Sequence, residues 1–297
     1  MQAFSSPPTL PYYSQQGRMT SPGRHVALLQ DLPGDVAGLA DVLHGLLIHE
    51  HLAEIYGVRL TDDDRASVHV RPAEDLLGLI HDRDDRPLSE PREPAARLPG
   101  NCRHYTVLMV AMLRARGVPA RARCGFGGYF VDGLFEDHWV CEYWDSSGQE
   151  WKLADAQIDE KQLEIFKADF NLTDVPRDRF LIAGDAWAKC RRGAADPSAF
   201  GLSLIKESGL WWIAANLMRD AAALCSIELL PWDAWGVMPA PYEEISADEI
   251  ALFDRLSGYT QLADEAFEQL QRLCSDDERL KVPPVVLNAL RRRKEPL

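Results

Sequence analysis

Cys102 stands where a predicted helix begins, and this position favours reactive sulfur chemistry. Asn101 is a good N-cap residue, so Cys102 falls at the first helical position. The unpaired N–H groups of a helix N-terminus and the positive end of its dipole favour a thiolate over a thiol, and the same N–H groups can hold a developing oxyanion. A small cysteine packed beneath a helix end is the alternative, and this stretch alone leaves both interpretations open.

The helix that carries Cys102 is predicted to be buried on most of its sides. It ends where Gly117 stops it and Pro119 bars its continuation. Apolar residues recur at the spacing of one helix face, and others fill much of the remainder. The face consists of Tyr105, Leu108, Met109, Met112 and Leu113, and Val107, Val110 and Ala111 occupy neighbouring positions.

A predicted β-hairpin carries an imidazole and a carboxylate. Its strands cover residues 138–144 and 150–156, and the turn at 145–148 has the Asp-first, Gly-fourth signature of a type I turn. If the hairpin is centred on that turn, His138 lies opposite Asp155, with Cβ atoms about 4.5–5.5 Å apart. A carboxylate beside an imidazole holds one tautomer and makes the ring more basic. The deduction depends on the register, because a slip of one residue places the two side chains on opposite faces.

The elements around these residues predict an α+β fold. Arg121 and Arg123 alternate with small apolar residues, which is typical of a half-buried strand with the arginines on its exposed face. The Gly-rich stretch at 125–133 lacks dinucleotide-binding spacing and no helix follows it, so we interpret it as a turn or mobile lip. Helices are predicted over residues 35–56, 72–82, 159–170, 178–190, 210–224, 247–257 and 263–273.

Composition excludes several classes of partner. The net charge of −14 argues against nucleic acid and anionic membranes as partners, and no stretch approaches the ~18 uninterrupted apolar residues of a membrane span. The N-terminus has no apolar signal region, and the six cysteines form no CxxC pair, so we expect free thiols in a reducing cytoplasm.

One domain is favoured over two. Residues 1–24 are rich in Pro, Ser and Gln and are expected to form an extended or disordered arm, mobile or draped over the surface. No disordered linker interrupts residues 25–297, for which we predict a single domain. Its catalytic core would cover residues 98–160, between helical flanks at 25–97 and 161–297.

His49 and His51 invite a metal-site interpretation, which the spacing disfavours. A zincin motif needs a second histidine four residues after the first, and that position is Ala53. Two residues two apart on a helix do not face the same way, so joint ligation is disfavoured. We expect no metal here.

The ordered motifs around Cys102 resemble the transglutaminase-like superfamily, and more loosely a bacterial subgroup of it. That superfamily has a G-x-C motif opening a helix, a G-[IV]-P-[AS]-R element, a His-x-W on a strand and an Asp on the next strand. The corresponding stretches here are GNC at 100–102, RARGVPAR at 114–121, HWV at 138–140 and LADAQ at 153–157. The resemblance implies a papain-like α+β core, with an antiparallel sheet packed on the cysteine helix and extra helices before and after it.

The resemblance also implies roles for individual residues. Cys102 would be the nucleophile, His138 the base and acid, and Asp155 the carboxylate that orients His138. Further candidates for substrate binding or the oxyanion site are Arg103, Trp139 and Asn101. Many relatives carry an Asp two residues after the nucleophile, where this chain has His104, which we interpret as a structural substitution because it does not face Cys102.

These roles together predict acyl transfer or amide hydrolysis through a thioester acyl-enzyme, with neither metal nor organic cofactor. The substrate would be a small molecule or peptide that contains an amide or thioester. The alternative is a catalytically dormant scaffold of the same fold that binds a ligand or protein.

Overall fold

The computed structural model describes residues 7–297 and has the predicted α+β composition. The chain forms two compact units, each described by itself below. The first contains residues 7–122 and 140–175, and the second contains residues 123–139 and 176–297. The segment expected to be the catalytic core, residues 98–160, contributes to both units.

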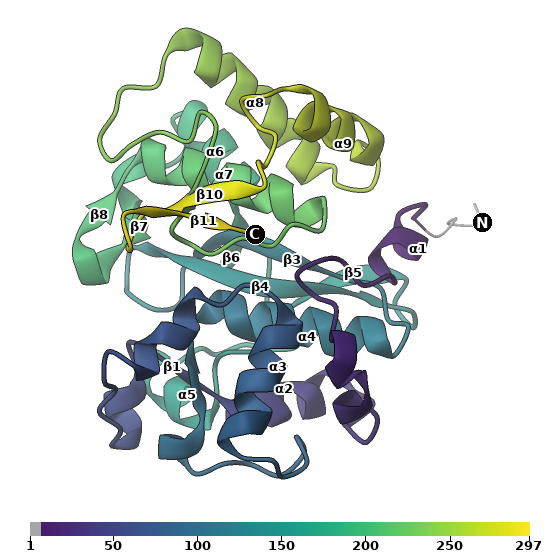
Figure 1. Cartoon of the computed structure of the whole chain (residues 1–297). Helices are drawn as coiled ribbons and strands as arrows, with labels where there is room; N and C mark the ends of the chain where they lie inside the picture. The colour runs from purple at the N-terminus through teal and green to yellow at the C-terminus, as the bar shows by residue number, and fades with distance from the viewer. Residues whose placement is uncertain (1–6) are drawn as a thin grey trace. The chain divides into compact units, whose positions relative to one another are not determined.

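Helix α4 lies at the centre of the first unit. It packs against α2, α3 and the short strand β2, and all of its residues from Cys102 to Arg114 are buried. Figure 1 shows α4 beside α2 and α3. The α-helices and strands of this unit are α1 (Leu10–Tyr13), α2 (Val36–Leu46), β1 (Leu47–His49), α3 (Ala73–Arg83), β2 (Leu98–Gly100), α4 (Cys102–Ala115), β5 (Glu150–Ala154) and α5 (Glu160–Phe166). Four 3₁₀ helices join them, η1 (Gly23–Leu29), η2 (Ala53–Tyr56), η3 (Asp64–His69) and η4 (Pro94–Ala96).

The helix predicted over residues 35–56 is shorter in the structure. Asp35 caps α2 by accepting a hydrogen bond from the Gly38 N–H, and the helix ends at Leu46. The chain then forms β1, which pairs in parallel with β2. The apolar run at 46–48 is compatible with either structure, and the distant partner strand decides between them.

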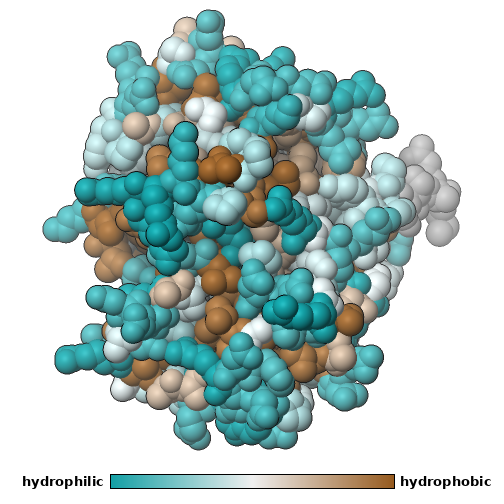
Figure 2. Space-filling view, in the orientation of Figure 1, coloured by the Kyte–Doolittle hydropathy of each residue, from teal (hydrophilic) through white to brown (hydrophobic). Residues whose placement is uncertain are grey.

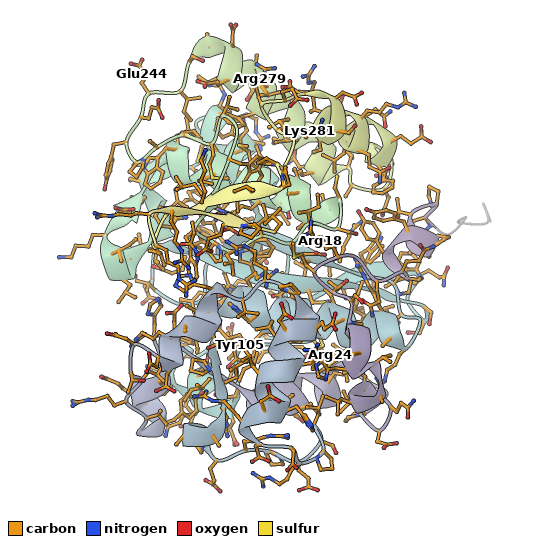
Figure 3. The ribbon with its side chains drawn as sticks, viewed as in Figure 1. Arg18, Arg24, Tyr105, Glu244, Arg279 and Lys281 are labelled. Carbon is orange, nitrogen blue, oxygen red and sulfur yellow. The ribbon has the colours of Figure 1, made fainter. Side chains whose placement is uncertain are left out.

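The described part of the N-terminal segment, from residue 7 onward, packs against the rest of the first unit. Tyr13 and Met19 are fully buried, and the Gln16 side chain donates a hydrogen bond to the Ala111 carbonyl of α4 at 2.8 Å. Arg24 of η1, which is labelled in Figure 3, has its Nε 3.8 Å from Oε1 of Glu74 on α3. Residues 1–6 of the expected arm lie outside the described residues.

The hairpin of β4 (Phe135–Asp145) and β5 has a different register from the predicted one. Cys141 pairs with Ala154 and Asp145 with Glu150, a shift of two residues. The prediction that His138 lies directly opposite Asp155 in the ladder is therefore wrong. Because Asp145 pairs with Glu150, the loop covers residues 146–149, two residues more than the predicted turn would leave unpaired, and Gln149 within it adopts a left-handed conformation with φ 55°. Asp155 comes immediately after the last residue of β5.

The second unit is built around helix α7 (Leu210–Leu224), whose bounds match the prediction. It packs against α6 (Ala183–Arg191) and α8 (Ala247–Gln261). The remaining elements are β6 (Phe180–Ile182), β7 (Phe200–Leu202), β8 (Glu207–Ser208), β9 (Asp233–Ala234), α9 (Phe267–Asp276), β10 (Val285–Asn288) and β11 (Arg293–Pro296), with 3₁₀ helices η5 (Pro197–Ala199) and η6 (Ser203–Ile205).

The larger sheet is mixed rather than antiparallel throughout. Its strand order is β6-β3-β4-β7-β8, with β5 also paired to β4, and β3 covers Ala120–Gly127. β4 pairs in parallel with β7, whereas β3 pairs antiparallel with β6. The short strands β6 to β11 were not predicted, because most have only two to four residues and show no period of their own.

The face drawn in Figure 2 is mostly hydrophilic, with smaller apolar groups between the polar side chains. Among residues 7–297, no helix combines the length and the hydropathy needed to cross a bilayer.

Candidate active site

Asn101 begins helix α4, and Cys102 is its first residue, as predicted. The backbone of Asn101 is extended, and its side-chain Oδ1 accepts a hydrogen bond from the Arg103 N–H at 3.2 Å. The cap leaves the backbone of Cys102 at the N-terminal end of a helix of 14 residues, where the dipole favours negative charge. The Cys102 side chain is mostly buried, with 7% of the residue exposed.

His104 completes the cap, which agrees with its predicted structural role. The Asn101 N–H donates to His104 Nδ1 at 3.2 Å, in the position that Glu or Gln usually takes in a capping box. Complete burial holds the pKa of His104 well below its usual value, so the ring is neutral and can accept that hydrogen bond. A Cβ at Gly100 would lie 3.1 Å from His104 Cβ, which explains why glycine suits this position.

Arg103, a candidate for substrate binding, is fully buried. Its Nη1 donates a hydrogen bond to the Arg71 carbonyl at 2.6 Å, which ties the first turn of α4 to the segment before α3. This contact favours a structural contribution by Arg103.

Glu50 is a buried carboxylate beside the cap of α4 that the sequence did not reveal. Its N–H donates to the Gly100 carbonyl at 2.8 Å, continuing the β1–β2 ladder up to the cap residue. Burial raises the pKa of Glu50, and Arg65, with Nη1 3.7 Å from Oε2, opposes that rise. The parallel pairing of β1 with β2 brings Glu50 here, and neither strand was predicted.

His138 lies on β4 in the second unit, inside an aromatic enclosure. Its ring centroid is 4.8 Å from that of Phe130, 6.1 Å from that of Tyr129 and 6.3 Å from that of Phe180. Only 2% of His138 is exposed. The Gly-rich stretch interpreted as a turn or lip thus supplies two of the three rings, which restrict the orientation of the imidazole.

The neighbours of His138 anchor β4. The Trp212 indole N–H of α7 donates to Asp137 Oδ2 at 2.7 Å, and burial raises the pKa of that carboxyl group. Trp139, a candidate for substrate binding, is 1% exposed, and its Nε1 has no hydrogen-bond acceptor within residues 7–297. Both residues flank His138 on the strand and so fix its position along β4.

Asp155 lies in the first unit, at a bend directly after β5. Its N–H donates to the Leu172 carbonyl at 2.8 Å, and its Oδ1 accepts a hydrogen bond from the Gln157 N–H at 3.0 Å. The residue is 2% exposed. These contacts give the carboxylate a defined position.

A pocket of about 210 Å³ lies beside Asp155 within the first unit. Met109 of α4 contributes to its apolar lining, and His44 and Asp41 of α2 contribute polar groups. Burial lowers the pKa of His44, so its imidazole is mainly neutral at pH 7.

The predicted site residues are therefore divided between the two units. Asn101, Cys102, Arg103 and Asp155 belong to the first, and His138 and Trp139 belong to the second.

Comparisons with known proteins agree with the motif analysis. Residues 81–156 match the family model of the transglutaminase-like superfamily. A curated relative, the protein-glutamine gamma-glutamyltransferase of Pseudomonas aeruginosa, is 24% identical over 246 residues, which cover 67% of this chain and 36% of the relative. The chain thus spans little more than a third of that relative's length.

A solved structure from Cytophaga hutchinsonii, described as that of a candidate cysteine protease, is similar to 59% of this chain and 46% of its own, with a TM-score of 0.34 and 13% identity. The family match covers the stretch that carries Cys102, His138 and Asp155. Residues 81–156 are thus similar to the transglutaminase-like superfamily.

Proposed function

We propose that this protein is a cysteine-dependent enzyme of acyl transfer or amide hydrolysis, with Cys102 as nucleophile, His138 as base and acid, and Asp155 as the orienting carboxylate. Superfamily members are typically cysteine acyltransferases or proteases. The observation that carries the proposal is the place of Cys102, first residue of a capped and buried helix inside the matched segment.

The reaction begins with attack by the Cys102 thiolate on the carbonyl carbon of an amide or thioester. A C–S bond forms, and the carbonyl electron pair moves to the oxygen, which the Cys102 N–H and a second donor stabilise. When the tetrahedral intermediate collapses, the bond to the leaving group breaks and His138 gives a proton to the departing amine or thiolate. The product of this step is a thioester on Cys102.

The acyl group then leaves with a second nucleophile. An amine or a water molecule attacks the thioester, His138 accepts its proton, and the C–S bond breaks to return the thiolate. An amine gives a new amide, and water gives a carboxylic acid. Because the relative from Pseudomonas aeruginosa is named a protein-glutamine gamma-glutamyltransferase, a glutamine side-chain amide is the first acyl donor to test.

The test uses a glutamine-containing peptide together with a fluorescent primary amine. The proposal predicts amine incorporation or ammonia release with the wild-type chain, and loss of both with Cys102→Ala. Cys124→Ala is the matched control, because Cys124 is a buried strand cysteine outside the proposed site. If Cys102→Ala retains full turnover, Cys102 is not the nucleophile.

A binding scaffold is the second candidate, and the low exposure of Cys102 favours it. In that case Cys102 would be inert toward small electrophiles in the native protein. A cytoplasmic location remains a prediction from the cysteine pattern.

A further inference from the structure

A closed ring of hydrogen bonds lies beside Asp155 in the first unit. The Tyr56 hydroxyl of η2 donates to Asp159 Oδ2 at 2.6 Å and accepts from Gln162 Nε2 at 3.0 Å. Asp159 Oδ1 in turn accepts from the Gln162 N–H at 2.9 Å, because Asp159 is the N-cap of α5. Tyr56 therefore joins the two ends of the first turn of α5.

Gln157 connects this ring to Asp155. Its side-chain Nε2 donates to Gln162 Oε1 at 3.1 Å, and its backbone N–H donates to Asp155 Oδ1 at 3.0 Å. Gln157 is 4% exposed and Gln162 is 1% exposed, so water competes little for these contacts. The orientation of the Asp155 carboxylate is thus coupled, through Gln157, to the side chain of Tyr56.

Burial and the hydrogen bond to Asp159 keep the Tyr56 hydroxyl protonated, so that it can act as a donor. Both raise the pKa of Tyr56 far above its usual value. The Arg97 guanidinium lies 5.8 Å from the ring centroid, and Lys161 Nζ lies 5.4 Å from it. Both cations lie over the aromatic ring, and these contacts restrict the direction in which the hydroxyl can point.

We propose that Tyr56 is a positioning residue for Asp155, acting through Gln162 and Gln157. The inference rests on the proposed function, in which Asp155 orients His138 and thereby supports the Cys102 thiolate. Loss of the Tyr56 hydroxyl would leave Asp159 Oδ2 without this donor and would remove the acceptor of the Gln162 side-chain amide, which could then rotate. Asp155 would then occupy a wider range of orientations and support the imidazolium of His138 less well.

The test is the pH profile of Cys102 alkylation by iodoacetamide in the full-length protein. If the Asp155 carboxylate stabilises the His138 imidazolium less, the pKa of His138 falls. The imidazolium then stabilises the Cys102 thiolate less, and the alkylation midpoint of Cys102 moves to higher pH. Tyr56→Phe is expected to lower the alkylation rate near pH 6 about two- to tenfold, the range of one lost hydrogen bond. Asp155→Asn is expected to lower it by at least about tenfold.

The double variant Tyr56→Phe/Asp155→Asn shows whether the two residues act in one pathway. The proposal predicts that the double variant is alkylated at the same rate as Asp155→Asn, because Tyr56 acts only through Asp155. Tyr143→Phe is the matched control: it also removes a tyrosine hydroxyl in the first unit, one that donates to the Thr173 carbonyl at 2.9 Å. Tyr143→Phe should leave the midpoint unchanged.

The outcomes separate this inference from the proposed function. If Asp155→Asn changes the profile and Tyr56→Phe does not, or if their effects multiply in the double variant, the positioning role of Tyr56 is overturned. If Asp155→Asn itself has no effect, the proposed role of Asp155 fails instead. Thermal unfolding of each variant shows whether a change in rate reflects loss of the fold.

Discussion

Arg121 and Glu142 form a buried ion pair in the first unit, with 2.6 Å between the guanidinium Nε and the carboxylate Oε2. Their side chains are 4% and 1% exposed, and the Arg121 guanidinium also lies over the Trp151 ring, 4.0 Å from its centroid. Both charges have lost their hydration, so each depends on the other.

Glu142→Gln is therefore expected to destabilise the protein by about 3–5 kcal/mol, because it removes the carboxylate that faces the buried Arg121 guanidinium. Urea denaturation measures this loss. Arg272→Ala breaks a pair with Glu268 whose side chains are 75% and 78% exposed, and it should change the free energy of unfolding by less than about 1 kcal/mol. Equal effects of the two substitutions would show that the Arg121–Glu142 pair is hydrated in solution.

The cap of α4 can be tested separately from the charge near Cys102. Asn101→Ala should cost about 0.5–2 kcal/mol of stability, because the Arg103 N–H loses its acceptor. Asn101→Asp keeps an acceptor oxygen for the Arg103 N–H, and its negative charge should move alkylation of Cys102 to higher pH. A stable Asn101→Ala variant would contradict the assigned cap.

His104 should make the stability of the protein sensitive to mild acid. Its folded-state pKa lies below the reference value of 6.5, so the unfolded chain binds more protons at acidic pH, and stability falls as the pH drops below about 6.5. The loss is at most about 1.4 kcal/mol for each pH unit. His104→Gln preserves the side-chain type found in capping boxes and removes the titration, so its stability should decline less between pH 6.5 and about pH 5. Identical slopes for the two proteins would contradict this assignment.

The strand after α4 could be predicted from its local pattern, but the burial of its two arginines could not. Alternation correctly predicted a strand after α4, but it placed Arg121 and Arg123 on an exposed face. Both are buried, because Glu142 and Asp220 supply carboxylates from distant segments. A single strand's pattern carries no information about such partners.

For the site residues too, local features could be predicted and features that depend on distant segments could not. The cap, the start of the Cys102 helix and the α+β class could be predicted, because N-caps and helix faces are local signals. The hairpin register was missed because Gln149 adopts a left-handed conformation that its residue type does not announce. Glu50 and Tyr56 were missed because pairing and burial over 50 to 106 residues of sequence separation bring them to Gly100 and Gln162.

Alkylation of the native protein by iodoacetamide, followed from about pH 5 to pH 9 and assigned to each cysteine by mass spectrometry, tests the central claim most directly. Cys124 and Cys141 are fully buried, and burial raises the pKa of Cys141, so both should stay unmodified as internal references. An activated nucleophile predicts selective labelling of Cys102 below about pH 7, lost in His138→Ala. If Cys102 stays unmodified until the chain unfolds, or reacts equally in His138→Ala, it is not an activated thiolate and the enzyme assignment is wrong.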